Sequence, residues 1–449
     1  MTERLRRSVP LLVSAAGAMI VALDGTVLLV AQPRLQRALA ASSSQIQWTS
    51  TGYLVAVAAL LVLAGRLGDR YGHVRLLCGG MLGFGAASAG IALAPSVGWV
   101  IGSRVAQGVF GAVLQPATLA VLRLAYSDGE LRRAVAVRTA AIAVAAGSGP
   151  VLGGVLVTHL GWRAVFWINV PIALAVVVLA IAVRPPLSGH AEPQRLDVTG
   201  AILLAGTLAL LVHALAGVPG RGWSAPRTLV ELCAVAGLVG ALVASERRAA
   251  HPIVPPAVAR SVPVTASMAL LLLATAGLFG SLFTATFVLQ DVLRLDPLAM
   301  GLRVLPMTVL MVLGSPLAGA ALGRWGARPT AVTGTLLVVL GIFGLSQLAH
   351  SGAPVPTGAV FAVIGAGFAA VMVTATGTVV GDAPPEYAGA VGGLKQTATN
   401  VGPTLGIALA TSAGAAGPAG PTLRLLAVVV VLGLLPAALM PGARSEESI

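Results

Sequence analysis

Asp24 is an acidic residue inside a long apolar stretch, residues 9–31. Of the fifteen acidic residues, it alone falls well inside such a stretch. A charged carboxylate at the centre of a membrane helix costs about 2.5–3.5 kcal/mol, so it needs a partner, a water-filled cavity or a proton. If water reaches this acid alternately from each side, it can take up a proton on one side and release it on the other. We therefore predict that Asp24 carries a proton. The alternatives are an acid that reaches water at the outer helix end and an acid neutralised permanently by a neighbour.

Arg104 opens a second polar stripe, because Gln107 and Gln115 follow it at helical spacing on the same face. An arginine is permanently charged, so it can influence the charge of an acid across a cavity. We predict that Arg104 acts together with Asp24. The two glutamines, with Thr26 and Gln32 of the first stretch, are the predicted lining of a substrate cavity. A structural ion pair, or hydrogen bonds between helices, is the competing interpretation.

A charged segment lies between two apolar stretches, and its candidate latch residues are Gly65, Asp69, Arg70, Gly72 and Arg75. A poorer copy recurs 254 positions later, where Gly319, Arg324 and Gly326 are kept and the acid is replaced by Gly323. The repetition predicts two related halves, as in secondary transporters. We expect a tight turn at the membrane surface, whose charges latch one conformation. A basic loop that only fixes membrane orientation is an equal alternative.

A small-residue motif stands in the stretch 136–158, and it consists of Gly149, Pro150, Gly153 and Gly154. Small residues at this spacing allow two helices to approach closely, and the proline bends its helix. Packing alone explains this motif as well as a functional role does.

The composition excludes an ordinary soluble fold, since 57% of the 449 residues are hydrophobic, 10% are charged and the mean hydropathy is +0.93. An all-α polytopic membrane protein fits these values. The net charge of +13 is scattered singly, so we expect no nucleic-acid partner. Cys78 and Cys233 lie in apolar stretches and form neither a disulfide framework nor a metal site. The sequence has no phosphate-cradling loop, metal-ligand cluster or catalytic triad, so we expect neither an enzyme nor a cofactor.

Apolar stretches of spanning length number fourteen, and the thirteenth is the weakest because it is short and rich in glycine. They lie at 9–31, 47–64, 76–94, 98–122, 136–158, 162–183, 198–217, 228–245, 264–289, 302–322, 330–349, 355–380, 400–417 and 422–440. The long polar links 184–197 and 246–262 bracket two of them. We therefore predict a six-helix bundle at 1–186, an inserted two-helix hairpin at 187–262 and a second six-helix bundle at 263–449.

Loop charge predicts the orientation of the chain. With the N-terminus inside, the cytoplasmic segments carry 19 basic residues and the opposite face carries 8. We expect both termini to be cytoplasmic, in a multi-pass protein of a bacterial cell membrane.

Taken together, these motifs resemble the major facilitator superfamily, and in particular its fourteen-span drug:proton antiporters. Gly65 to Arg75 is similar to the signature loop, Arg104 to Pro116 to the second motif, and Gly149 to Gly154 to the exporters' antiporter motif. The resemblance extends to the first stretch, although Leu29 and Gln32 depart from the usual pattern there. It implies proton-driven export of drugs, antibiotics or metabolites, with Asp24 and Arg104 in proton coupling and Asp69 and Arg70 in the latch.

We therefore expect an exporter that works by alternating access and is driven by the proton gradient without a cofactor. One deeply placed acid favours small lipophilic substrates that are neutral or carry a single positive charge. A monomer is the default expectation, with membrane lipid and protons as further partners. Two other interpretations stay open: a solute importer or uniporter of the same fold, and a membrane scaffold or receptor that transports nothing.

Overall fold

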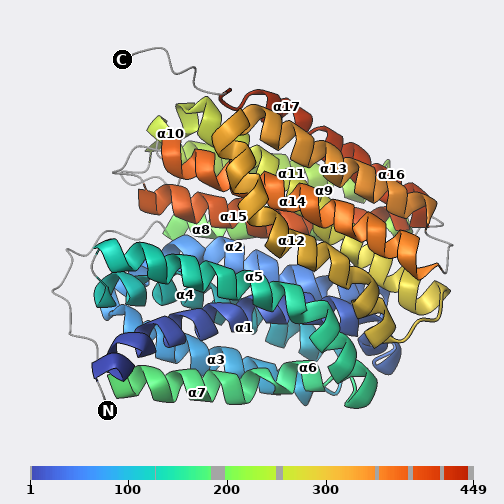
Figure 1. Cartoon of the computed structure of the whole chain (residues 1–449). Helices are drawn as coiled ribbons and strands as arrows, with labels where there is room; N and C mark the ends of the chain where they lie inside the picture. The colour runs from blue at the N-terminus through green and yellow to red at the C-terminus, as the bar shows by residue number, and fades with distance from the viewer. Residues whose placement is uncertain are drawn as a thin grey trace. The chain divides into compact units, whose positions relative to one another are not determined.

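The computed structural model describes residues 3–126, 128–183, 198–248, 256–348, 353–382, 388–414 and 419–442. Within these ranges the regular structure is helical (Figure 1). The chain divides into two compact units, Met1–Ala205 and Gly206–Ile449. The all-α fold expected from the apolar stretches is therefore confirmed.

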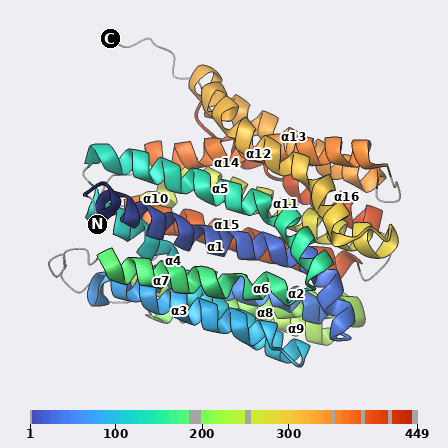
Figure 2. The same ribbon diagram turned by 60° about the horizontal axis from the view of Figure 1, so that its bottom comes forward.

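The first unit is built mainly from seven helices. They are α1 (Glu3–Ala38), α2 (Ser43–Tyr71), α3 (His73–Ala92), α4 (Val97–Ala125), α5 (Asp128–His159), α6 (Ala164–Trp167) and α7 (Asn169–Val183). Helix α1 packs against α5, α4 and α7, while α4 also contacts α2 and α3. Helix α7 lies along α3 in both ribbon views (Figures 1 and 2). Helices α2, α3, α5 and α7 therefore surround the neighbouring helices α1 and α4.

The second unit begins within the eighth helix and contains the remaining ones. They are α8 (Val198–Arg221), α9 (Pro226–Arg248), α10 (Pro256–Arg260), α11 (Val262–Phe287), η1 (Val288–Val292), α12 (Pro297–Trp325), α13 (Ala327–Gln347), α14 (Pro354–Asp382), α15 (Ala388–Gly414), α16 (Ala419–Val431) and α17 (Leu434–Ala438). Helix α11 packs chiefly on α15, and α14 packs on α12 and α13. The Ser412 hydroxyl of α15 donates to the Leu215 carbonyl of α8 over 2.7 Å. This bond ties the predicted hairpin to the second unit.

Ten of the described helices are long and apolar enough to cross a membrane. Two shorter apolar helical stretches, Val144–His159 and Ile202–Leu215, lie in α5 and α8. Each of the fourteen predicted stretches lies wholly or mostly on helix, yet α2 and α15 are not among the ten. A multi-pass membrane protein is therefore confirmed, while the count of fourteen spans and the three-part division of the chain stay predictions.

The charged segment at 65–75 differs from the predicted tight turn. Residues 65–71 continue helix α2, and the chain turns at one residue, Gly72, before α3 begins at His73. Gly72 has φ +93°, a backbone conformation that side chains with a Cβ rarely adopt. Its N–H still donates to the Gly68 carbonyl. A single glycine is therefore enough to end one helix and start the next.

The copied segment in the second unit turns in the same way. Gly326 has φ +84°, ends α12 and precedes α13, and its N–H donates to the Leu322 carbonyl. It stands 254 positions after Gly72, which is the offset of the sequence repeat. The two units therefore repeat the same helix–glycine–helix junction, as the sequence predicts.

Candidate functional site

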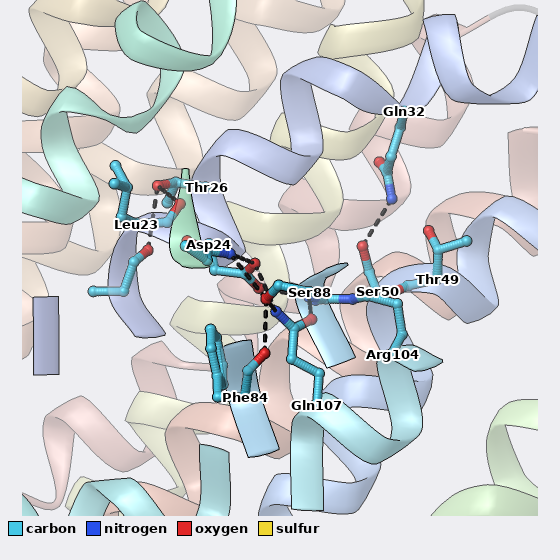
Figure 3. Close-up of polar contacts among 12 residues, drawn as sticks. Leu23, Asp24, Thr26, Gln32, Thr49, Ser50, Phe84, Ser88, Arg104 and Gln107 are labelled. Carbon is cyan, nitrogen blue, oxygen red and sulfur yellow. Dashed lines mark hydrogen bonds and ion pairs between the residues drawn. The ribbon is translucent and has the colours of Figure 1, made fainter. Parts of the chain in front are cut away.

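Asp24 lies on α1 in the interior of the first unit, with 3% of its surface exposed. Its carboxylate forms an ion pair with the Arg104 guanidinium of α4. The other carboxylate oxygen accepts hydrogen bonds from Gln107 Nε2 at 3.1 Å and Asn169 Nδ2 at 2.9 Å (Figure 3). Three side chains from two other helices thus converge on one acid.

Arg104 is itself held from several directions, and it is 1% exposed. Its guanidinium also donates to Gln107 Oε1, and its Nε donates to the Thr49 carbonyl of α2 over 2.8 Å. The Tyr53 ring lies under the guanidinium, 4.4 Å from ring centroid to Cζ. A cation over an aromatic face in a desolvated place gains roughly 2 kcal/mol. Helix α2 therefore orients the arginine toward α1.

Ser88 and Asn169 complete the cluster, and the sequence prediction missed both. The Ser88 hydroxyl accepts from Gln107 Nε2 at 2.8 Å and from Asn169 Nδ2 at 3.3 Å, and donates to the Phe84 carbonyl. Both residues are polar positions within apolar stretches of α3 and α7, a signal visible in the sequence. That signal did not say which helix faces would meet.

The donors around Asp24 match an ionised carboxylate. An ionised carboxylate only accepts hydrogen bonds, and each of the three neighbours presents an N–H to it. A protonated acid would place a hydroxyl against one of these donors. Hydrogen bonds that involve charged groups are worth about 1.5–3 kcal/mol each. The arrangement therefore links α1 to α4 and α7 through hydrogen bonds to one carboxylate.

The other predicted cavity residues do not join this cluster. Gln32 is buried and donates to the Ser50 hydroxyl of α2 over 2.7 Å (Figure 3). Thr26 is half-buried and donates to the Leu23 carbonyl of its own helix. Gln115 is half-buried on α4. Only Gln107 of the four predicted cavity residues therefore contacts Asp24, and there it serves as a donor to the acid.

The small-residue motif of α5 packs against the same part of α1. A Cβ at Gly149 would collide with the Thr26 side chain, and a Cβ at Gly153 would lie 3.2 Å from the Val27 Cα. Pro150 and Gly154 are buried in the same helix. The predicted close helix contact is thus present, two residues along α1 from the acid.

The predicted latch residues lie at helix ends, apart from the ion pair. For Gly65, Asp69 and Arg70 the structure describes the helical backbone and not the side chains, so their latch role lies outside what it describes. Arg75 and Arg324 are exposed, and so is Gly319, with open space around it. Among the described residues, no group of three or more His, Cys, Asp and Glu side chains could hold a metal ion.

A bundle of membrane-spanning helices with an ion pair in its interior is an arrangement that membrane transporters use. Residues 14–407 match the Major Facilitator Superfamily. This chain belongs to that transporter family.

Two relatives are similar over most of their length. The chain is 40% identical over 400 residues to the tetracenomycin C resistance and export protein of Streptomyces glaucescens, covering 89% of this chain and 74% of that protein. It is 33% identical over 412 residues to the puromycin resistance protein of Streptomyces alboniger, covering 90% and 81%. The fold is similar to a crystal structure of a peptide transporter with bound sulfate, with a TM-score of 0.72, 16% identity, and 96% and 93% coverage.

Proposed function

We propose that this protein exports small organic compounds, of the antibiotic or drug class, across a bacterial cytoplasmic membrane. The observation that carries the proposal is the 40% identity to a protein named for tetracenomycin C resistance and export. The second relative is named for puromycin resistance. Two relatives named for resistance to different compounds support an exporter of lipophilic molecules and leave the compound itself unnamed.

We further propose that export is coupled to proton uptake at Asp24. The ion pair with Arg104 links α1 to α4, and a proton on Asp24 removes the charge that holds this link. A device of this kind has two states, and protonation shifts the balance between them. Antiport requires that substrate and proton exclude each other, so the substrate would bind best while the pair is intact and Asp24 carries no proton.

The cost of breaking a buried ion pair and the free energy supplied by one proton are of similar size. Removing one charge of a buried ion pair costs about 3–5 kcal/mol. One proton crossing a membrane at ~100 mV gains about 2.3 kcal/mol, and one pH unit adds about 1.4 kcal/mol. The sum, about 3.7 kcal/mol, equals a roughly 400-fold gradient of a neutral solute exchanged one for one. Because the pair re-forms in every cycle, this free energy remains available to drive the solute.

The architecture that goes with this function is the one predicted from the sequence. We propose fourteen spans, two six-helix bundles at 1–186 and 263–449 with an inserted hairpin at 187–262, and both termini in the cytoplasm. Alternating access requires only one copy of the chain, so the proposed working unit is a monomer in lipid. The glycine junctions at Gly72 and Gly326, with the charges beside them, are the proposed latch.

Two experiments test the proposal in sequence. A susceptible bacterium that expresses the protein should tolerate higher concentrations of some members of a panel of toxic compounds. The purified protein should then release protons when such a compound is added, and Asp24→Asn should release none. Equal release from both proteins would remove Asp24 from the coupling and leave the pair with Arg104 as a structural contact.

A solute importer or uniporter of the same fold is the second candidate. It predicts transport by the Asp24→Asn protein that ignores a pH gradient, and accumulation inside the cell. A scaffold or receptor predicts no transport of any compound in the panel. The named function of the 40% identical relative favours export over both.

A further inference from the structure

Several buried polar atoms of the first unit have no hydrogen-bond partner among the residues that the structure describes. They are Gln32 Oε1, both side-chain atoms Oε1 and Nε2 of Gln47, Tyr53 Oη and Asn169 Oδ1. Gln32 and Gln47 are 0% exposed, Asn169 is 1% exposed and Tyr53 is 4% exposed. A buried polar atom left without a partner destabilises a fold substantially, and buried water is the usual partner where protein atoms do not provide one.

Gln47 and Tyr53 belong to one row of residues that winds along α2. Ser44, Gln47, Ser50 and Tyr53 are spaced three residues apart, which makes each the surface neighbour of the next on a helix. The rise per step is about 4.5 Å, a gap that one bridging water molecule fills. At one end Ser44 is half-buried beside the exposed Ser43. At the other end the Tyr53 ring lies under Arg104.

Gln32 extends this path to α1. It lies two helical turns after Asp24 on α1. Its side-chain amide donates to the Ser50 hydroxyl of α2 (Figure 3). Its carbonyl oxygen stays unpartnered. Thr49 precedes Ser50 on α2, and its backbone carbonyl accepts a hydrogen bond from Arg104 Nε. The path therefore ends at the ion pair.

We propose that Gln47, Ser50 and Gln32 enclose a file of bound water that runs from the Ser43–Ser44 end of α2 to the Asp24–Arg104 ion pair. A glutamine with both amide atoms buried and unpartnered is a poor packing residue and a good water ligand, because it offers both a donor and an acceptor. The file is the route by which Asp24 exchanges its proton with the side of the membrane at which α2 begins. That role rests on the proposed proton coupling, whereas the file itself does not.

The file is tested by radiolytic hydroxyl-radical labelling of the purified full chain in ¹⁸O-water, because radicals form at bound water and modify the aromatic ring beside it. Tyr53 is the probe. Phe166 is the internal control, since it is 0% exposed and sits in the apolar interior of the same unit. Tyr53 should be labelled several-fold faster than Phe166. Labelling of Tyr53 at no more than the rate of Phe166 would overturn the proposal.

A variant pair locates the water. Gln47→Leu replaces the unpartnered amide by an apolar side chain of similar size, which is close to neutral for folding. It should reduce Tyr53 labelling to the level of Phe166, while Gln347→Leu, the same change at an exposed position of α13, should leave it unchanged. Unchanged labelling in Gln47→Leu would also overturn the proposal. If that variant fails to fold, Ser50→Ala takes its place with the same expected loss.

Proton release separates this proposal from the proposed function. Gln47→Leu should slow compound-triggered proton release, measured with a pH dye in a stopped-flow instrument, without reducing the final amount, because Asp24 is still present. Labelling of Tyr53 without any proton release from the unaltered protein would refute the coupling and keep the file. Proton release without labelling would refute the file and keep the coupling.

Discussion

At the scale of single residues, the centre of this protein is one carboxylate and the donors that surround it. The sequence predicts Asp24 and Arg104 as partners, and the structure pairs them directly. Gln107 forms hydrogen bonds with both partners, so it stabilises the ion pair directly. Asn169 adds a donor from α7. The acid is thus held by three side chains, and a proton on it would place a hydroxyl against one of these donors.

This arrangement predicts strong coupling between the two charges. Arg104→Gln leaves a buried carboxylate without its cation and should cost about 3–5 kcal/mol of stability. Adding Asp24→Asn to that variant removes the unpaired charge, so the double variant should unfold at a higher temperature than Arg104→Gln alone. Thermal unfolding of the purified proteins in one detergent measures both. Losses that simply add up would show that the two residues do not interact.

At the scale of elements, glycines set how closely the helices approach. Gly149 of α5 faces Thr26 of α1, where a Cβ does not fit. Gly108 of α4 faces α2 equally closely, because a Cβ at this position would lie 2.5 Å from the Tyr53 carbonyl oxygen. The contact at Gly108 brings α2 near enough to α4 for Arg104 to reach the Thr49 carbonyl. Packing by small residues therefore helps to position the arginine of the ion pair.

The first prediction at this scale concerns the contact between α1 and α5. Gly149→Ala should destabilise the protein by about 1–3 kcal/mol through overpacking. Gly79→Ala in α3 is the matched control, since nothing lies within 4 Å of the added methyl group. Unfolding temperatures in detergent compare the two. Equal temperatures for both variants would mean that α1 shifts away from α5 at little cost.

The second prediction concerns the glycine junctions. Gly326→Ala forces a residue with a Cβ to φ near +84° and should cost about 1–3 kcal/mol. Gly319→Ala changes an exposed glycine inside helix α12, with open space around it, and should be neutral or stabilising by up to about 1 kcal/mol. Chemical or thermal unfolding of the two variants gives the comparison. A neutral Gly326→Ala would show that the junction adapts.

At the scale of the whole molecule, the two units share a junction and its arginine but not its acid. The first carries Asp69 and Arg70 beside Gly72, whereas the second carries Gly323 and Arg324 beside Gly326. The buried Asp24–Arg104 pair belongs to the first unit, and the described salt bridges of the second unit gather around Glu231 in the predicted hairpin. The proposed proton site therefore has no described equivalent in the second unit.

The proposed fourteen-span topology predicts which loops face outward. With Cys78 and Cys233 replaced, a cysteine at Ser224 in the α8–α9 connection should react with a membrane-impermeant thiol reagent added to intact cells. A cysteine at the exposed Arg75, on α3 after the Gly72 junction, should react only after the membrane is opened. Labelling of Ser224→Cys only in opened cells would exclude an inserted hairpin with this orientation.

The sequence by itself determined the class of this protein and the residues at its centre. Apolar stretches of membrane length leave few possible folds, because a spanning backbone must satisfy its own hydrogen bonds within helices. An acid in such a stretch needs a partner, and Arg104 is the arginine that lies deepest inside another stretch. These are local properties, readable from composition and spacing.

Only the tertiary structure decided which polar residues meet. Asn169 and Ser88 are single polar residues in apolar helices, and the rotation of α7 and α3 about their axes brings them to Asp24. The orientations of α1 and α2 likewise direct Gln32 to Ser50 and leave the Gln47 amide buried with no partner among the described residues. A helix period fixes which residues share a face, but the neighbour that this face meets is set by packing among several helices at once.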